Sequence, residues 1–117
     1  MGNRSAKNKK RGTSMTALRK RAQALETQFA RQAELQFKVN ARLNRMAGRW
    51  AGYTMGLDDV EAYAQTLAIR QVVEPHRLLD LLRQEFCKAG VKVSDADIDQ
   101  RIHVLSEQAS AELYSIA

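Results

Sequence analysis

The chain has little of several residue types that mark particular classes of protein. Its 117 residues include one cysteine and one proline. A lone Cys87 cannot form an internal disulfide, which is typical of a reducing compartment. No apolar run approaches the ~20 residues that a membrane-spanning helix needs, and the N-terminus lacks the apolar core of a secretory signal. We therefore expect a small cytoplasmic protein that is not transmembrane.

Acidic residues are absent from the first 25 positions, which hold eight basic residues. Residues 54–117 show the opposite balance, with eleven acidic residues against six basic ones. The formal net charge of +6 is therefore an average over a basic arm and an acidic remainder. Such asymmetry predicts that the arm meets an acidic partner surface.

Residues 1–14 are polar and nearly free of large apolar side chains, so we expect them to be disordered. They are either a solvated tail, with Met15 as a possible true start, or an arm that contacts nucleic acid. Phosphate binding needs clustered basic residues, which are present as Lys7, Lys9, Lys10 and Arg11. Residues 1–28 offer no aromatic ring on which a base could stack. We therefore expect no specific nucleic-acid partner.

Apolar residues recur at helical spacing from Thr16 to about Met55, and no proline interrupts them. Forty helical residues span ~60 Å, whereas a compact domain of this size has a radius of gyration near ~13 Å. The N-terminal part of such a helix must project, fray or bind something. Residues 16–28 are sparsely apolar, so we expect them to fray when free.

Three more helices are predicted, over Asp58–Val73, from Pro75 to Ala89, and from Ser94 onward. Gly56 and Gly90 follow helical runs as natural stops, and Ser94 suits a helix cap. The short connections make these helices antiparallel neighbours. The predicted fold class is all-α, a four-helix bundle with a long first helix and a disordered basic N-terminal arm.

No residue pattern predicts catalysis or metal binding. His76 and His103 stand alone, without a partner at a metal-ligand spacing. Cys87 lies beside the apolar stripe of the third helix, where we expect a small core residue. The sequence therefore predicts no enzyme, no metal and no cofactor, although a ligand between helices would leave no sharp motif.

One set of residues forms an ordered pattern, Phe37-Lys38, Ala41-Arg42, Asn44, Gly48, Trp50-Ala51 and Gly56-Leu57. This pattern is similar to the F(R/K)…AR-N…G-WA…GL sequence of the zeta subunit of alphaproteobacterial ATP synthases. Further matches follow in order at Tyr63-Ala64, Ala89-Gly90 and 94–98. The resemblance covers roughly residues 29–110 and implies a four-helix bundle. It implies structural roles for Phe37, Arg42, Asn44, Gly48, Trp50, Gly56, Tyr63, Gly90, Ser94 and Asp95.

The resemblance also implies a function, because that subunit inhibits the ATPase activity of the rotary enzyme. An N-terminal segment, here 15–28, would insert into the catalytic head of alpha, beta and gamma subunits, and residues 29–117 would form the bundle. The implied contact residues are Leu18, Arg21, Ala24, Leu25, Glu26 and Phe29. The chain would be a monomer when free and peripheral to the inner membrane through the ATP synthase. Residues 1–14 look like an added extension.

The chain departs from the family pattern at Arg19, Lys20 and Ala22, where the family usually has an acidic run. The local charge is thereby reversed. Two alternatives therefore stay open beside the inhibitor. One is a bundle of the same fold that has lost inhibition, and the other is a basic-armed adaptor that binds nucleic acid or an anionic membrane.

Overall fold

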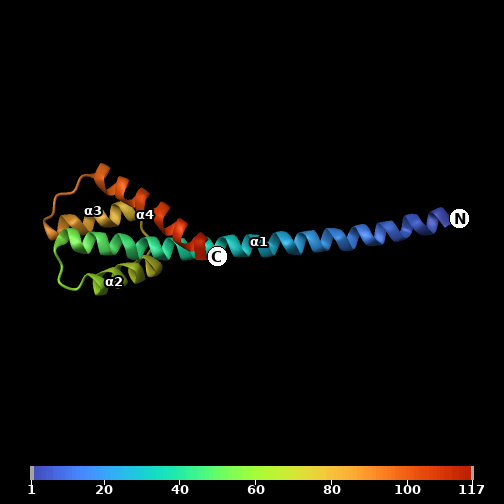
Figure 1. Ribbon diagram of the computed structural model, residues 1–117, viewed down its shortest axis with the longest axis horizontal. Coiled ribbons are helices and arrows are strands. Elements are labelled where there is room, and N and C mark those ends of the chain that lie inside the picture. The colour runs from blue at the N-terminus through green and yellow to red at the C-terminus, as the bar shows by residue number, and fades with distance from the viewer. Residues whose placement is uncertain (1, 117) are drawn as a thin grey trace. The chain divides into compact units, whose positions relative to one another are not determined.

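The computed structural model describes the backbone of residues 2–116 and the side chains of residues 15–115. The described residues form four helices, α1 (Gly2–Met55), α2 (Val60–Val73), α3 (Leu78–Ala89) and α4 (Asp95–Ile116) (Figure 1). The predicted all-α class with a long first helix is confirmed. The chain divides into two compact units, Met1–Leu35 and Gln36–Ala117, and α1 contributes to both.

The first unit consists of the N-terminal part of α1. Its helix begins at Gly2 rather than at the expected Thr16. Residues 2–14 contain no proline, so nothing in their covalent structure prevents the helix from continuing. We predicted disorder for residues 1–14. The side chains of these residues lie outside the part of the chain that the structure describes. Every residue from 15 to 34 is exposed.

The second unit is a bundle built from the C-terminal part of α1 with α2, α3 and α4. Figure 1 shows that each of these later helices runs opposite to the helix before it, as the short connections predicted. All four helices contribute to one buried apolar cluster, which contains Ala47, Ala51, Leu67, Leu81, Leu82, Phe86 and Ile98. The small residues of α1 allow the larger side chains of α2 and α3 to fill the centre.

The connection from α1 to α2 depends on one glycine. Gly56 has a φ of +72°, a left-handed conformation that favours glycine, and the Leu57 amide donates to the Gly52 carbonyl at 3.0 Å. The Asp59 carboxylate then accepts a hydrogen bond from the Ala62 amide at 3.1 Å. Gly56 thus ends α1 as predicted, and Asp59 caps α2.

The connection from α2 to α3 is held by a buried glutamine. The Gln71 side-chain amide donates to the His76 carbonyl at 3.0 Å, and its oxygen accepts from the His76 amide at 2.9 Å. Helix α3 begins at Leu78 and not at Pro75 as we predicted. The reason is that the two Gln71 hydrogen bonds engage the backbone at position 76, and Arg77 has an extended conformation.

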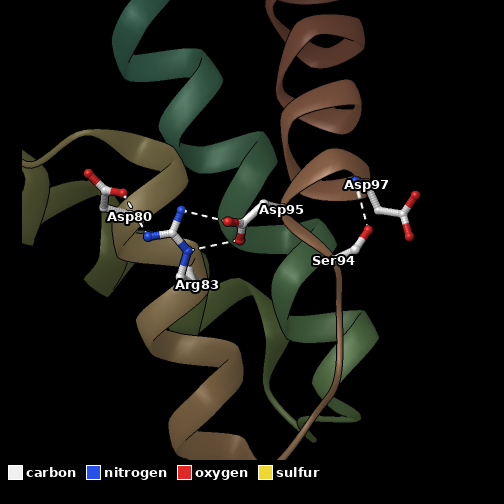
Figure 2. A network of polar contacts seen from close by, with 5 residues as sticks. All are labelled: Asp80, Arg83, Ser94, Asp95 and Asp97. Atoms are coloured by element: carbon white, nitrogen blue, oxygen red, sulfur yellow. Dashed lines mark hydrogen bonds and ion pairs between the residues drawn. The ribbon is translucent and has the colours of Figure 1, made fainter.

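The connection from α3 to α4 is short and well capped. Gly90 has a φ of +71°, and the Val91 amide donates to the Phe86 carbonyl at 2.9 Å, so α3 ends in a left-handed cap. The Ser94 hydroxyl accepts from the Asp97 amide at 3.1 Å and caps α4 (Figure 2). Both caps were predicted from the sequence.

Candidate partner-binding helix

A stripe of large apolar side chains lies in water on the first unit of α1. Leu18 is 61% exposed, Leu25 60% and Phe29 74%. With 3.6 residues per turn, these three positions fall within about 40° of one another around the helix. A continuous apolar stripe of this kind, left exposed, marks an interaction surface more often than a solvated face.

The other predicted contact residues lie around this stripe at different angles. Arg21 and Glu26 are exposed and flank the stripe on opposite sides, about 60° and 80° from Leu18. Ala24 is also exposed but lies about 120° from Leu18. The helix therefore brings five of the six predicted contact residues to one side and leaves Ala24 apart.

Gly48 and Trp50, two residues of the sequence pattern, take part in packing the helices of the bundle against one another. A Cβ built on Gly48 would lie 2.8 Å from the Ala64 Cα, so α1 and α2 approach closely there. The Trp50 ring meets the Phe86 ring edge-to-face, with centroids 5.3 Å apart. The Arg101 guanidinium lies 5.6 Å from the Trp50 ring centroid, within the range of a cation–π contact. These contacts place both pattern residues in the packing of the bundle.

Polar contacts of the pattern residues also tie helices to one another. The Tyr63 hydroxyl donates to Glu85 at 2.8 Å, and Arg70 donates to the same carboxylate at 3.2 Å. Burial, reinforced by the hydrogen bond to Glu85, raises the pKa of Tyr63. Arg42 on α1 pairs with Glu112 on α4 at 2.7 Å. Together these pairs join α2 to α3 and α1 to α4.

A polar network fixes the start of α4 against α3. Arg83 donates to both oxygens of Asp95, at 2.8 and 2.9 Å, and to Asp80 at 3.2 Å (Figure 2). The hydrogen bonds from Arg83 hold the pKa of Asp95 below its usual value. Both groups are solvent-exposed, so this contribution to stability is screened by salt.

Two positions differ from the roles that the sequence suggested. Phe37, expected to be structural, is 62% exposed, and the Cys87 thiol, expected in the core, is exposed as well. Cys87 lies about 100–140° around α3 from Leu81, Leu82 and Phe86, the α3 residues in the core, so it falls on the outer side of that helix. Asn44 is half-buried and lines a groove of about 440 Å³ together with Phe37.

Within the described part of the chain, no three His, Cys, Asp or Glu side chains are grouped closely enough to hold a metal ion. The same residues include no helix that is both long and apolar enough to cross a bilayer. The stripe on α1 is therefore the feature that calls for a functional explanation.

Comparison with family models decides the family. The model of ATPase inhibitor subunit zeta matches residues 15–112, most of the chain. The chain belongs to the ATPase inhibitor zeta subunit family. The match begins at Met15, so it includes the exposed stripe and leaves out the basic residues 1–14. The family is one of inhibitor subunits and not of catalytic chains.

Comparison of the chain with curated proteins and with solved structures gives no match. The identification of this zeta family member therefore rests on the family model and on the ordered residue pattern. Both cover the bundle, and the family model extends to the stripe on α1.

Proposed function

We propose that the chain inhibits ATP hydrolysis by the catalytic head of the rotary ATP synthase. The helix of residues 15–29 inserts at an interface between catalytic and non-catalytic subunits, next to the central shaft. The observation that carries the proposal is that the family match includes an exposed apolar stripe on a helix. The partners in this proposal are the alpha, beta and gamma subunits.

The stripe supports this mode of binding because its geometry suits an amphipathic helix in a groove. Leu18, Leu25 and Phe29 serve as apolar anchors at i, i+7 and i+11. Burying one such side chain contributes about 1.5–3 kcal/mol, which is the main source of affinity here. Arg21 and Glu26, on the flanks, make the polar contacts at the edge of the groove.

The bundle gives the inserted helix a base that stays outside the head. The apolar faces of α2, α3 and α4 are buried in the core of the bundle, so the bundle can stay folded on binding. Held outside the interface, it blocks rotation of the shaft in the hydrolytic direction. Insertion and blocking are thus divided between the two units of the chain.

The test is ATP hydrolysis by the cognate catalytic head, titrated with the full chain, with a chain that begins at Ala30, and with Leu25→Glu. The control is Ile69→Glu, which places the same charge on an exposed apolar residue of the bundle. The proposal is supported if the full chain and the Ile69→Glu control inhibit hydrolysis, while the chain that begins at Ala30 and the Leu25→Glu variant do not. A full chain that neither binds the head nor slows hydrolysis refutes it.

A further inference from the structure

The exposed side of the first unit carries a heptad pattern as well as a simple stripe. Apolar residues occur at steps of three, four, three and four, and they are Met15, Leu18, Ala22, Leu25 and Phe29. All five are exposed on the helix. This spacing forms the a and d positions of a two-stranded coiled coil, in which each seam packs against another seam of the same kind.

We propose that this seam binds the seam of a second copy of the chain in antiparallel orientation. In the register that we infer, Leu18 faces Phe29 of the second copy, and Ala22 faces Leu25 of the second copy. The two-fold symmetry repeats both layers, which gives four apolar layers. The consequence of this interface for inhibition rests on the proposed function, because the interface covers the same apolar residues that would enter the ATPase head.

Side-chain volume favours the antiparallel register over the parallel one. Antiparallel pairing sets the small Ala22 against the larger Leu25 in each of the two central layers, so the layers fill evenly. Parallel pairing would set Ala22 against Ala22 and Phe29 against Phe29, leaving one layer underfilled and another crowded. Facing large and small residues pack without voids or strain.

Two charge arguments also favour the antiparallel orientation. Arg19 and Glu26 occupy equivalent flanking positions beside the seam, and antiparallel pairing brings Arg19 of each chain beside Glu26 of the other. Parallel pairing would also align the two arms of residues 1–14, each with five basic residues. Antiparallel pairing places the starts of the two seams about 25 Å apart, well beyond the Debye length of about 10 Å.

The resulting dimer is weak and reversible. Four layers correspond to two heptads, fewer than the three or four heptads of a sustained coiled coil, so association depends on protein concentration. The monomer expected from the sequence is then the dilute form. Self-association hides Leu18, Leu25 and Phe29, so a chain in the dimer cannot insert into the head.

The experiment is sedimentation equilibrium of the full-length chain at low salt over rising concentration. We expect the average mass to rise from 13.2 kDa toward twice that value. Arg19→Glu and Glu26→Arg should each stay monomeric, because each sets like charges side by side in its own dimer. An equimolar mixture of the two variants should associate again. The control Arg31→Glu makes the same charge change away from the seam and should associate like the unaltered chain.

Two results would overturn the inference. One is a mass of 13.2 kDa for the unaltered chain at every concentration. The other is full association of Arg19→Glu alone, which parallel pairing of Arg21 with Glu26 would produce. Neither measurement contains the ATPase head, so failure here leaves the proposed function standing. Loss of that function, in turn, would not alter the mass of the free chain.

Discussion

Gly48 of α1 lies against Ala64 of α2 so closely that a methyl group at position 48 would meet the Ala64 Cα at 2.8 Å. The atom that it would meet belongs to the backbone and cannot rotate away. The packing of α1 on α2 therefore depends on the absence of a side chain at one position. Four residues later, the contact at Gly52 is with a side chain, the Val60 Cγ1 at 3.2 Å.

The first prediction follows from that difference. Gly48→Ala gains about 1 kcal/mol of helix propensity but suffers overpacking that costs about 1–3 kcal/mol, so we expect a net loss of stability. Gly52→Ala serves as the matched control and should be less destabilising, because the valine methyl can shift. Urea denaturation of the two variants measures the difference. Equal stability of both would show that α1 and α2 separate easily.

The second prediction concerns the centre of the bundle. Phe86 is almost fully buried and contacts Trp50 edge-to-face. Phe86→Ala should lower the free energy of unfolding by about 3–5 kcal/mol, through lost burial and the cavity left behind. Tyr114→Ala, at an exposed position, should change it by no more than about 0.5 kcal/mol. Thermal denaturation followed by circular dichroism would compare them, and similar melting temperatures would contradict this account of the core.

The third prediction concerns Tyr63 at alkaline pH. Tyr63→Phe removes the hydrogen bond to Glu85 and should cost about 1 kcal/mol at neutral pH. Because the folded pKa of Tyr63 is raised, the unfolded chain ionises first, and this contribution to stability is lost as pH rises above about 10. The variant should therefore lose less stability than the unaltered chain above that pH. Parallel pH profiles of the two would disprove the point.

The fourth prediction concerns Asp95 at acid pH. Its folded pKa is lowered by Arg83, so its contribution to stability is present above the unfolded pKa of about 4 and is lost as pH falls through the folded pKa. Asp95→Asn should flatten the acid side of the profile of melting temperature against pH. Added salt should reduce the difference, since the pair is exposed. Asp99→Asn, outside the Arg83 network, is the matched control for loss of an exposed carboxylate on α4.

The fifth prediction concerns the basic residues in the helix that we propose as inhibitory. Arg19 and Lys20 lie about 100° and 200° from Leu18 around the helix, away from the apolar anchors. Exposed ion pairs contribute about 0–1 kcal/mol each, so replacing both residues by Asp should change half-inhibition by less than about thirtyfold. A titration of ATP hydrolysis measures this. Inhibition that appears only in the doubly substituted chain would mean that the native sequence has lost the activity.

The elements with strong local signals were predicted well, and those set by distant contacts were not. Gly56, Gly90 and Ser94 end or begin helices through local geometry, so the sequence alone located them. The start of α3 was placed three residues early, because a proline is typical of a first helical position and the Gln71 hydrogen bonds were not foreseen.

The polar network around Glu85 also escaped the sequence analysis. Its partner Tyr63 lies 22 residues away and Arg70 lies 15 residues away, so no periodic pattern connects them. The exposure of Phe37 was missed for a related reason, since an aromatic residue at helical spacing does not reveal which side of the helix faces the core. The proposed contact residues on α1 follow a helical period, which places five of the six on one side of the helix.

The paired hydrogen bonds between Gln71 and the backbone of His76 limit where extra residues can be inserted into the chain. They close a loop of fixed length, so even one residue added between positions 72 and 75 would separate the donor and acceptor that Gln71 joins. The link between Gly90 and Ser94 carries no such side-chain bridge among the described residues. A fluorescent label or a tether is therefore better placed in the second link than in the first.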